Sequence, residues 1–447
     1  MESYLQEVKN FRQKWPNIEF VDLIFTDINA TPRGKRIPVS ALHKLHKGIA
    51  LPLSTITLDT KGNVVETAGL GEELGEPDNM CFPIADTLMP TAKEQVGQIM
   101  LSMMDESTHT PNPLFIRNIV SEILEKLHAK DQHPCVALEL EFYLIDRKRG
   151  EMGALQTAIN PNKKSREKDT EVYDLDGLDD YADFLADLNK VAQEQGLNTS
   201  GALSESAPGQ FEINFNHSKD VLRVCDEIII VKRLIRQIAN QHDFDATFMA
   251  KPFSEQAGNG MHIHLSLVDS NDNNHFSQRD GEPSNLFYQT MAAMLAQTSD
   301  SMALICPNVN SYRRFVPGAY VPTKADWGEN HRGVALRVPI SDSNNRRIEH
   351  RIAGADVNPY ILAAVVLSAV LASENYTKDQ CPNSLSDDAI DLPLRMSEAL
   401  VQLERSELTP YISKEFVDLY LACKRSELAE FERAITPLEI DWMLHSA

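Results

Sequence analysis

The feature that most constrains this chain is a segment with two unlike faces, directly after a Gly-Asn-Gly turn at residues 258–260. Residues 262–267 read His-Ile-His-Leu-Ser-Leu, so polar and apolar side chains alternate. Because side chains at i and i+2 share one face of a β-strand, His262, His264 and Ser266 are predicted to line the polar face of a strand. On its own, such a strand is more typical of a solvated sheet surface.

Two other segments carry the same pattern, and the three together indicate a shared polar surface. Residues 138–144 read Leu-Glu-Leu-Glu-Phe-Tyr-Leu, which places Glu139 and Glu141 on one face. Residues 347–351 read Arg-Ile-Glu-His-Arg, which places two arginines and Glu349 on one face. Carboxylates with an imidazole suit hard divalent cations, and guanidiniums suit anionic ligand groups. We therefore expect three strands that line one concave site, rather than three separately solvated faces.

The composition indicates an ordinary globular protein and narrows its partners. The chain has 447 residues, of which 42% are hydrophobic and 24% charged, and its formal net charge is −22. Because nucleic-acid binding needs a basic surface, no nucleic-acid partner is expected, whereas a cationic substrate would be attracted. The longest apolar run, residues 361–372, is too short to cross a bilayer, so no membrane partner is expected. Six scattered cysteines without a Cys-x-x-Cys pair favour a cytoplasmic location.

Strand-like and helix-like patterns are arranged as in an α+β chain. Short strands broken by Gly and Pro predict a small mixed N-terminal domain over residues 1–110. Longer helical patterns and the three two-faced strands follow, which predicts a larger domain over residues 111–447. Because strands and helices do not alternate regularly, a doubly wound parallel sheet is not expected. Apolar periodicity predicts helices over residues 2–14, 116–127, 178–194, 219–241, 286–304, 360–373, 394–405 and 413–432.

With these motifs, the chain resembles the glutamine synthetase superfamily along nearly all of its length. The resemblance implies a small N-terminal β-grasp-like domain and a larger catalytic domain whose antiparallel strands form a funnel-shaped site. It also implies a homo-oligomeric ring, a dodecamer in the family, with active sites shared between neighbouring subunits. The motifs occur in family order at residues 21–27 (Val-Asp-Leu-Ile-Phe-Thr-Asp), 139–142 (Glu-Leu-Glu-Phe), 208–212 (Pro-Gly-Gln-Phe-Glu), 260–264 (Gly-Met-His-Ile-His), 310–318 (Asn-Ser-Tyr-Arg-Arg-Phe-Val-Pro-Gly), 347–351 and 358–360 (Asn-Pro-Tyr).

The resemblance implies two divalent metal ions in the active site. Carboxylates with one imidazole suit Mg²⁺ or Mn²⁺, and the sequence does not distinguish between these two ions. Glu205 and Glu212 flank a Pro-Gly break, where exposed acidic residues are common, so a solvated loop is the alternative for this pair. The implied ligands are Glu141, Glu205 and Glu212 for one ion, and Glu139, His262 and Glu349 for the other.

The roles of the other site residues also rest on the resemblance. Guanidiniums suit such roles because they bind phosphate and carboxylate oxygens through two parallel hydrogen bonds. For any one arginine, a surface ion pair is the alternative. The implied residues are the catalytic Arg332, Arg351 and Glu349, the substrate-binding Gly258, Arg314, Tyr320 and Arg351, and the nucleotide-binding His264, Ser266, Arg337 and Arg347.

The implied reaction joins glutamate to an amine, with ATP as a substrate. ATP would phosphorylate the γ-carboxylate of glutamate, and the amine would then displace phosphate from the acyl phosphate. The metal ions would neutralise the transferring phosphoryl group and order glutamate, while the arginines would bind phosphate oxygens. The family is therefore expected to use ATP together with Mg²⁺ or Mn²⁺.

Three positions depart from glutamine synthetase itself. Pro52 stands where the family enzymes carry an aspartate that binds ammonium, and Tyr320 stands where they carry a flap glutamate. Losing both carboxylates removes the groups that would hold a small bare cation, whereas a tyrosine ring can contact an alkylamine or receive an ammonium group by a cation–π interaction. Ile390 replaces the tyrosine that becomes adenylylated in regulated bacterial enzymes, so this control is not expected.

These departures make the chain similar to the γ-glutamylpolyamine branch of the family. The leading hypothesis is an ATP-dependent ligase that joins the γ-carboxylate of glutamate to putrescine or a related polyamine. The alternative within the same chemistry is glutamine synthetase, which uses ammonium. An inactive scaffold of the same fold is a third hypothesis, against which stands the complete set of six metal ligands. A Gly-x-Gly-x-x-Gly motif and a Walker lysine loop are both absent, so an oxidoreductase finds no support.

Overall fold

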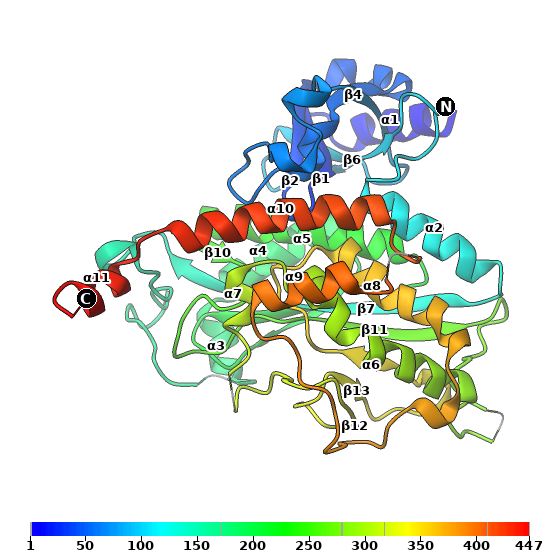
Figure 1. Ribbon diagram of the computed structural model, residues 1–447. Coiled ribbons are helices and arrows are strands. Elements are labelled where there is room, and N and C mark those ends of the chain that lie inside the picture. The colour runs from blue at the N-terminus through cyan, green and yellow to red at the C-terminus, as the bar shows by residue number, and fades with distance from the viewer. Residues whose placement is uncertain (1, 171, 279, 317, 409, 447) are drawn as a thin grey trace.

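The chain folds around two β-sheets, each formed by its own part of the sequence (Figure 1). The computed structural model describes residues 2–170, 172–278, 280–316, 318–408 and 410–446. The first sheet has six strands in the order β2-β1-β6-β4-β3, with β5 paired to β6, and forms the upper lobe of Figure 1 with helix α1 (Glu2–Lys14). Its strands are β1 (Phe20–Thr26), β2 (Pro32–Pro38), β3 (Ile49–Pro52), β4 (Asp78–Pro83), β5 (Met89–Pro90) and β6 (Val96–Met104).

The second sheet has eight strands and carries most of the polar residues singled out in the sequence. Its order is β12-β13-β14-β11-β7-β9-β8, with β10 paired to β7. Every pair is antiparallel except β12 with β13, which confirms the expected mixed α+β architecture with a largely antiparallel catalytic sheet. The strands are β7 (His133–Asp146), β8 (Thr199–Ser204), β9 (Gln210–Phe215), β10 (Phe244–Thr247), β11 (Met261–Val268), β12 (Trp327–Glu329), β13 (Leu336–Val338) and β14 (Ile348–His350).

A layer of helices packs against the second sheet and holds the main hydrophobic core (Figure 1). All fourteen residues of α8 are buried, which explains why the segment is apolar on every side. Among the helices in the described ranges, none is both long enough and apolar enough to span a membrane. The helices of this part of the chain are α2 (Ile116–His128), α3 (Leu175–Asp180), α4 (Ala182–Glu194), α5 (Val221–Gln241), α6 (Asn285–Ile305), α7 (Val309–Tyr312), α8 (Pro359–Ala372), α9 (Met396–Arg405), α10 (Lys414–Arg433) and α11 (Pro437–Met443).

One predicted helix, over residues 178–194, is in fact two. The first helix, α3, begins earlier because the Asp174 side chain accepts a hydrogen bond from the backbone N–H of Asp176 and so caps its N-terminus. Tyr181 then adopts non-helical backbone angles, with φ −116° and ψ 22°, and separates α3 from α4. Apolar periodicity continues across this break, so the sequence pattern alone does not detect it.

The two lobes are joined by residues 105–115 and by buried polar contacts. Asn358, at the start of α8, donates hydrogen bonds to the carbonyl oxygens of Asp27 and Ile28 in the N-terminal lobe. The fully buried Lys424 of α10 contacts the side-chain oxygen of Asn29. Because the two sheets lie on either side of the connecting segment, we propose that the domain boundary lies in it, near residue 110.

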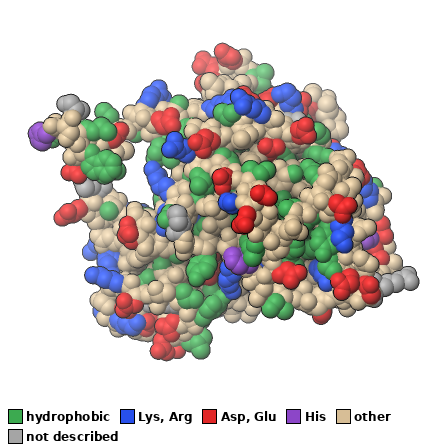
Figure 2. Space-filling view, turned by 60° about the horizontal axis from the view of Figure 1, so that its bottom comes forward, with side chains coloured by type: hydrophobic (Ala, Val, Ile, Leu, Met, Phe, Trp, Pro, Cys, Tyr) green, Lys and Arg blue, Asp and Glu red, His purple; other side chains and the backbone are tan. Residues whose placement is uncertain are grey.

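The surface reflects the strongly negative net charge. Figure 2 shows acidic side chains spread widely over the viewed face, with lysine and arginine between them. The end of the chain departs from the body, where α11 projects at the left of Figure 1 and exposes its apolar side chains. Exposed side chains of this kind are costly in water unless another surface covers them.

Candidate active site

The pairing of β7 with β11 brings the Glu-x-Glu and His-x-His motifs together. In the antiparallel register, Glu139 lies opposite His262, and the Nδ1 atom of His262 is 3.1 Å from a carboxylate oxygen of Glu139. The next histidine on the same face, His264, places its Nε2 atom 2.9 Å from the other oxygen of Glu139. The polar faces of the two strands therefore point the same way, as the alternating pattern predicts.

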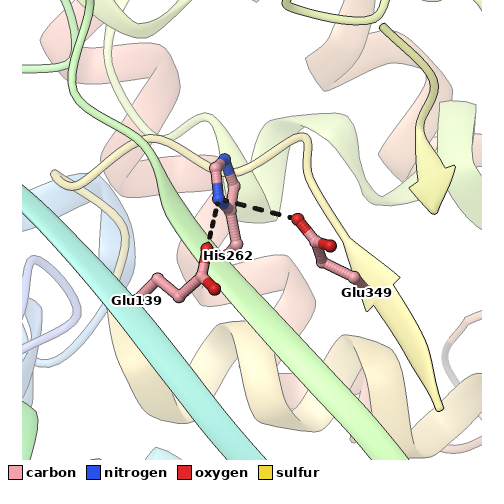
Figure 3. Close-up of side chains that lie close together, drawn as sticks. All are labelled: Glu139, His262 and Glu349. Carbon is pink, nitrogen blue, oxygen red and sulfur yellow. Dashed lines mark hydrogen bonds and ion pairs between the residues drawn. The ribbon is translucent and has the colours of Figure 1, made fainter. Parts of the chain in front are cut away.

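Strand β14 completes this group from the other side of β11. Glu349 is fully buried and lies opposite His264 in the register, and its carboxylate is 4.0 Å from Nδ1 of His262. Figure 3 shows Glu139, His262 and Glu349 converging from three neighbouring segments of the sheet. Each offers one ligand atom, and these atoms lie within 4.8 Å of one another. Such a set matches the size and ligand type of a site for a divalent cation.

A second group lies beside the first, on β7 and β9. Glu141 lies opposite Glu212, and together with His262 they again offer ligand atoms within 4.8 Å of one another. The backbone N–H of Gly260 donates a 2.7 Å hydrogen bond to Glu141 and fixes its carboxylate. Glu205 follows the end of β8 and is not part of either group, although the charge of Glu141 acts on it. We call Glu139, Glu141, Glu212, His262 and Glu349 the carboxylate–imidazole cluster.

The electrostatics of the cluster show an excess of negative charge on one side. Burial and the charge of Glu141 raise the pKa of Glu205 to about 7. Burial, together with Glu139, Glu141 and Glu205, raises the pKa of Glu212 to about 9. Burial also raises the pKa of Glu141. Carboxylates crowd here without enough cations to pair with them.

The other side of the cluster is compensated by cationic groups. Burial would raise the pKa of Glu139, but hydrogen bonds to His262 and His264 outweigh it and hold that pKa well below its usual range. The pKa of Glu349 is also lowered, because the charges of His262 and Arg351 outweigh its burial. The cluster therefore combines ionised and protonated carboxylates at neutral pH.

These features fit the divalent ions that the sequence implies. All the ligand atoms are carboxylate oxygens or one imidazole nitrogen, which suits Mg²⁺ or Mn²⁺, and no cysteine belongs to either group of the described residues. The raised pKa values of Glu205 and Glu212 show that ionising all of these crowded carboxylates is unfavourable without a cation, and a bound divalent ion would favour their ionised forms. The residues present therefore fit divalent metal ions, with His262 common to both groups.

Arginines surround Glu349 on β13 and on the segment after β14. Arg337 lies opposite Glu349 in the register and donates a 2.8 Å hydrogen bond to it, and Arg351 forms an ion pair with its other oxygen. Arg347 approaches His264, with 3.4 Å between Nε and Nδ1. The sheet thus brings together three of the arginines to which the family resemblance gives catalytic or nucleotide-binding roles, Arg337, Arg347 and Arg351.

Arg314 and Gly258 lie in direct contact near Gly260. The guanidinium of Arg314 is buried, and its Nη1 donates a 2.6 Å hydrogen bond to the carbonyl oxygen of Ile352. A Cβ atom at Gly258 would lie 2.6 Å from Cγ of Arg314 and 2.5 Å from the carbonyl oxygen of Ala250. Only glycine leaves room for this approach, which is a physical reason for glycine at position 258.

Several predicted residues lie outside the cluster in the single chain. Ser266 lies on β11 opposite Cys135, beyond His264, and is half-buried. Arg332 is exposed on a loop, where it donates a 3.2 Å hydrogen bond to the hydroxyl of Tyr173. Tyr320 is 76% exposed, and in the described part of the chain no hydrogen bond or ion pair joins it to the cluster.

The other two positions that depart from the family also lie apart from the cluster. Pro52 ends β3 in the N-terminal sheet, opposite Asp78, and Ile390 is exposed. Pro317, within the motif at residues 310–318, lies outside the described residues. Within one subunit, therefore, neither Pro52 nor Ile390 reaches the carboxylate–imidazole cluster.

The structure adds residues that the sequence pattern did not identify. The side-chain amide of Gln210 donates 3.0 Å hydrogen bonds to the Gly258 carbonyl oxygen and to the Asn259 side chain, which fixes the turn before β11. The ring of His217 lies 6.1 Å from that of His264, between their centroids. The hydroxyl of Tyr173 accepts a hydrogen bond from Arg332 at 3.2 Å. Each of these contacts joins segments far apart in sequence, so no local pattern indicates it.

Comparison with known proteins agrees with this geometry. The family model for the glutamine synthetase catalytic domain matches residues 115–443. The chain is 45% identical over 452 residues to gamma-glutamylputrescine synthetase PuuA of Escherichia coli (strain K12), covering 100% of this chain and 96% of that protein. It is 30% identical over 450 residues to glutamate–isopropylamine ligase of a Pseudomonas species, covering 97% and 96%.

The fold agrees with solved structures as well. A structure of a GmaS/ADP complex superposes with a TM-score of 0.83 at 25% identity, and the match covers 98% of this chain and 99% of that one. The sheet register, the carboxylate–imidazole cluster and these full-length similarities lead to one conclusion: the chain belongs to the glutamine synthetase family.

Proposed function

We propose that this protein is an ATP-dependent ligase that joins the γ-carboxylate of glutamate to putrescine or a related polyamine. The observation that carries the proposal is the meeting of Glu139, His262 and Glu349 with Arg337 and Arg351 at one place in the sheet. Divalent-ion ligands beside guanidiniums suit the transfer of a phosphoryl group. The 45% identity to gamma-glutamylputrescine synthetase over the full chain supports the choice of acceptor.

The metal ligands are assigned to two ions, Mg²⁺ or Mn²⁺. Bound divalent ions would supply charge neutralisation for the transferring phosphoryl group. Glu139, His262 and Glu349 would hold one ion, and their mutual distances support this assignment. Glu141 and Glu212 would hold the other together with Glu205. The charge of Glu141, in addition to burial, raises the pKa of Glu205, which supports a position of Glu205 near Glu141.

Glutamate is assigned to the region beside Arg314. Its guanidinium would bind a substrate carboxylate, next to the close approach that Gly258 permits. Arg332 and Arg351 would bind phosphate oxygens during formation of γ-glutamyl phosphate, with Arg351 also close to glutamate. Arg337 and Arg347 would contact the nucleotide, together with His264 and Ser266 from β11.

The amine would then displace phosphate from γ-glutamyl phosphate. A polyamine is favoured over ammonium because Pro52 and Tyr320 carry no carboxylate to hold a small bare cation. The exposed ring of Tyr320 can contact an alkyl chain or a distal ammonium group. The negative net charge also attracts a dicationic substrate.

A substrate comparison tests this assignment. The protein is incubated with glutamate, ATP and Mg²⁺, with either putrescine or ammonium as the acceptor, and ADP release is measured beside the mass of the product. We expect ADP and γ-glutamylputrescine with putrescine, and a much slower reaction with ammonium. A clear preference for ammonium would make the protein a glutamine synthetase, and no ADP release with any amine would favour the inactive scaffold.

We further propose a cytoplasmic, homo-oligomeric ring, expected to be a dodecamer with sites shared between subunits. The separation of Pro52 and Tyr320 from the cluster within one chain supports a site that a neighbouring subunit completes. The exposed apolar side chains of α11 support assembly, since a partner surface would cover them. All six cysteines are free, which suits a reducing compartment. Light scattering of the purified protein measures the subunit number.

A further inference from the structure

The segment that follows β14, residues 351–357, contacts two turns near Arg314. One is the turn at residues 258–260, and the other is the α7 turn at residues 308–312. The backbone N–H of Met261 donates to the carbonyl oxygen of Ala353, and that of Ala355 donates to the carbonyl oxygen of Asn259, each at 3.0 Å. These bonds tie residues 353–357 to the turn at residues 258–260. The same segment therefore packs beside the contact between Gly258 and Arg314.

Asp356 links this segment to the turn from which Arg314 arises. One of its carboxylate oxygens, Oδ2, accepts a 2.8 Å hydrogen bond from the Asn308 side chain and a 2.7 Å hydrogen bond from the Ser311 hydroxyl. The Ser311 hydroxyl also accepts a hydrogen bond from the backbone N–H of Asn308, at 3.0 Å. Asn308 and Ser311 form the N-terminal capping box of the one-turn helix α7, and Arg314 follows its C-cap residue, Arg313.

The backbone on both sides of Asp356 is held by a buried lysine, Lys232. Lys232 is buried, and its ammonium group donates hydrogen bonds to the carbonyl oxygens on either side of Asp356, at 2.6 Å to Ala355 and 3.3 Å to Val357. A Cβ atom at Gly354 would lie 2.6 Å from Oδ1 of Asp356, so glycine leaves the space that this carboxylate fills. A buried lysine side chain thus fixes the backbone on both sides of Asp356, and a glycine leaves room for its carboxylate.

Residues 351–356 hold both the backbone and the guanidinium of Arg314 in position. Its backbone lies on the turn that Asp356 holds, while its guanidinium donates to the carbonyl oxygens of Ile352, at 2.6 Å, and Arg351, at 3.4 Å. A shift of the α7 turn relative to this segment would therefore move the guanidinium away from its acceptors. Catalytic and binding side chains tolerate displacements of only about 0.5 Å before affinity falls.

From these contacts we infer that Asp356 is a positioning residue that sets the Arg314 guanidinium for glutamate binding. The inference rests on the proposed function, in which Arg314 binds a carboxylate of glutamate. Asp356 does not touch the substrate; it acts through the Asn308 and Ser311 side chains and the α7 turn. Ser311 is buried, so water cannot replace the bond that Asp356 provides.

The test compares Asp356→Ala with Asp356→Asn. The alanine variant loses both hydrogen bonds, so the KM for glutamate should rise about tenfold, which corresponds to about 1.4 kcal/mol, while the KM for ATP and putrescine stays near that of the wild type. The asparagine variant should retain the wild-type KM, because a single amide oxygen can accept both bonds that Oδ2 accepts. Ser311→Ala, which removes one donor, should lie between the two.

A matched control separates positioning from general destabilisation. Asp105 also holds a turn through its carboxylate, accepting hydrogen bonds from the Ser107 hydroxyl and the Thr108 backbone N–H, but it lies in the segment between the lobes. Asp105→Ala should leave the KM for glutamate unchanged. A lower melting temperature in Asp356→Ala with an unchanged KM for glutamate would overturn the inference, as would an equal rise in the KM of all three substrates.

Direct binding keeps the inference distinct from the proposed function. If the wild-type protein forms no product with putrescine, the proposed acceptor is wrong, but glutamate binding can still be measured by isothermal titration calorimetry in the presence of Mg²⁺. The inference predicts about tenfold weaker glutamate binding by Asp356→Ala than by the wild type or Asp356→Asn. Equal affinity for glutamate in all three proteins would contradict it.

Discussion

Two parts of the candidate site are built in different ways. The carboxylate–imidazole cluster stands on β7, β9, β11 and β14, where the ladder fixes each side chain, and Glu349 is fully buried. By contrast, Tyr320 and Arg332 stand on loops; Tyr320 is 76% exposed and has a left-handed φ of 52°. The proposed metal ligands of the cluster therefore stand on strands, whereas Tyr320, which we propose contacts the amine, stands on an exposed loop. Substitutions in the two parts should therefore differ in size and in substrate dependence.

The largest effect is expected at the cluster, from Glu349→Ala. The change removes a metal ligand and leaves Arg337 and Arg351 without their buried carboxylate partner. Product formation, measured by mass spectrometry, should fall at least about 10³-fold with every amine. The exposed Glu125→Ala on α2 is the control and should keep wild-type activity. Retention of a tenth or more of the activity by Glu349→Ala would break the assignment of this group.

A second pair of substitutions tests whether a buried side chain that does not stand on a strand also has a large effect on glutamate binding. Arg314 lies on an irregular segment but is buried, whereas its neighbour Arg313 is exposed. Arg314→Ala should raise the KM for glutamate about 10- to 100-fold, since a hydrogen bond to a charged group contributes about 1.5–3 kcal/mol. Arg313→Ala should change it less than about twofold, because the exposed Arg313 side chain lies over the ring of Phe431 on α10 instead. Equal effects in steady-state kinetics would show that burial does not distinguish the two arginines.

The pH dependence of stability tests the charge within the cluster. Burial and neighbouring carboxylates raise the pKa of Glu205 to about 7 and of Glu212 to about 9, from a reference value of 4.5. Between pH 4.5 and each folded-state pKa, the carboxyl group is protonated in the folded state and ionised in the unfolded state. The folded state therefore binds more protons, and stability falls as pH rises. After treatment with a chelator, the free energy of unfolding should fall by several kcal/mol between pH 5 and pH 9, since a shift of one pKa unit corresponds to about 1.4 kcal/mol.

Added Mg²⁺ should remove this pH dependence, because a bound cation favours the ionised carboxylates. Glu212→Gln cannot release the proton, so the chelator-treated variant should lose less stability over the same range. Denaturant titrations at several pH values provide the measurement. An unchanged slope in Glu212→Gln would show that Glu212 does not carry the raised pKa.

The smallest effect is expected on the loop, and it should depend on the amine. Tyr320→Glu replaces an exposed ring with a carboxylate, so kcat/KM for putrescine should fall about two- to fivefold, the size of an exposed cation–π contact of about 0.5–1 kcal/mol. Tyr320→Phe keeps the ring and should behave as the wild type. A fall of the same size with every amine tested would mean that Tyr320 acts on catalysis rather than on acceptor choice.

The strand-built part of the site could be predicted largely from the sequence. Alternation along residues 139–141, 262–264 and 347–351 fixes which side chains share a face, because the side-chain period of a strand is two. The α+β class and most helices followed from apolar periodicity in the same way. The register of the strand pairs could not be predicted, however. No local sequence pattern indicates that His262 lies opposite Glu139 while Glu141 lies opposite Glu212.

The loop-built part could not be predicted from local patterns. The contact between Asp356 and Ser311 joins residues 45 positions apart, and that between Tyr173 and Arg332 joins residues 159 apart. Such contacts depend on how the sheet and helices pack, which no short motif encodes. The split of the helix predicted over residues 178–194 has a related cause, since the apolar face continues while the backbone of Tyr181 leaves the helical region.

The most direct test of the account is a Mn²⁺ titration monitored by electron paramagnetic resonance, on the chelator-treated wild type and on Glu349→Ala. The account holds that carboxylates and one imidazole from separate strands bind two divalent ions per subunit. It predicts two tightly bound Mn²⁺ ions in the wild type and the loss of one of them in the variant. No tight binding by the wild type, or the same number of bound ions in both proteins, would contradict it.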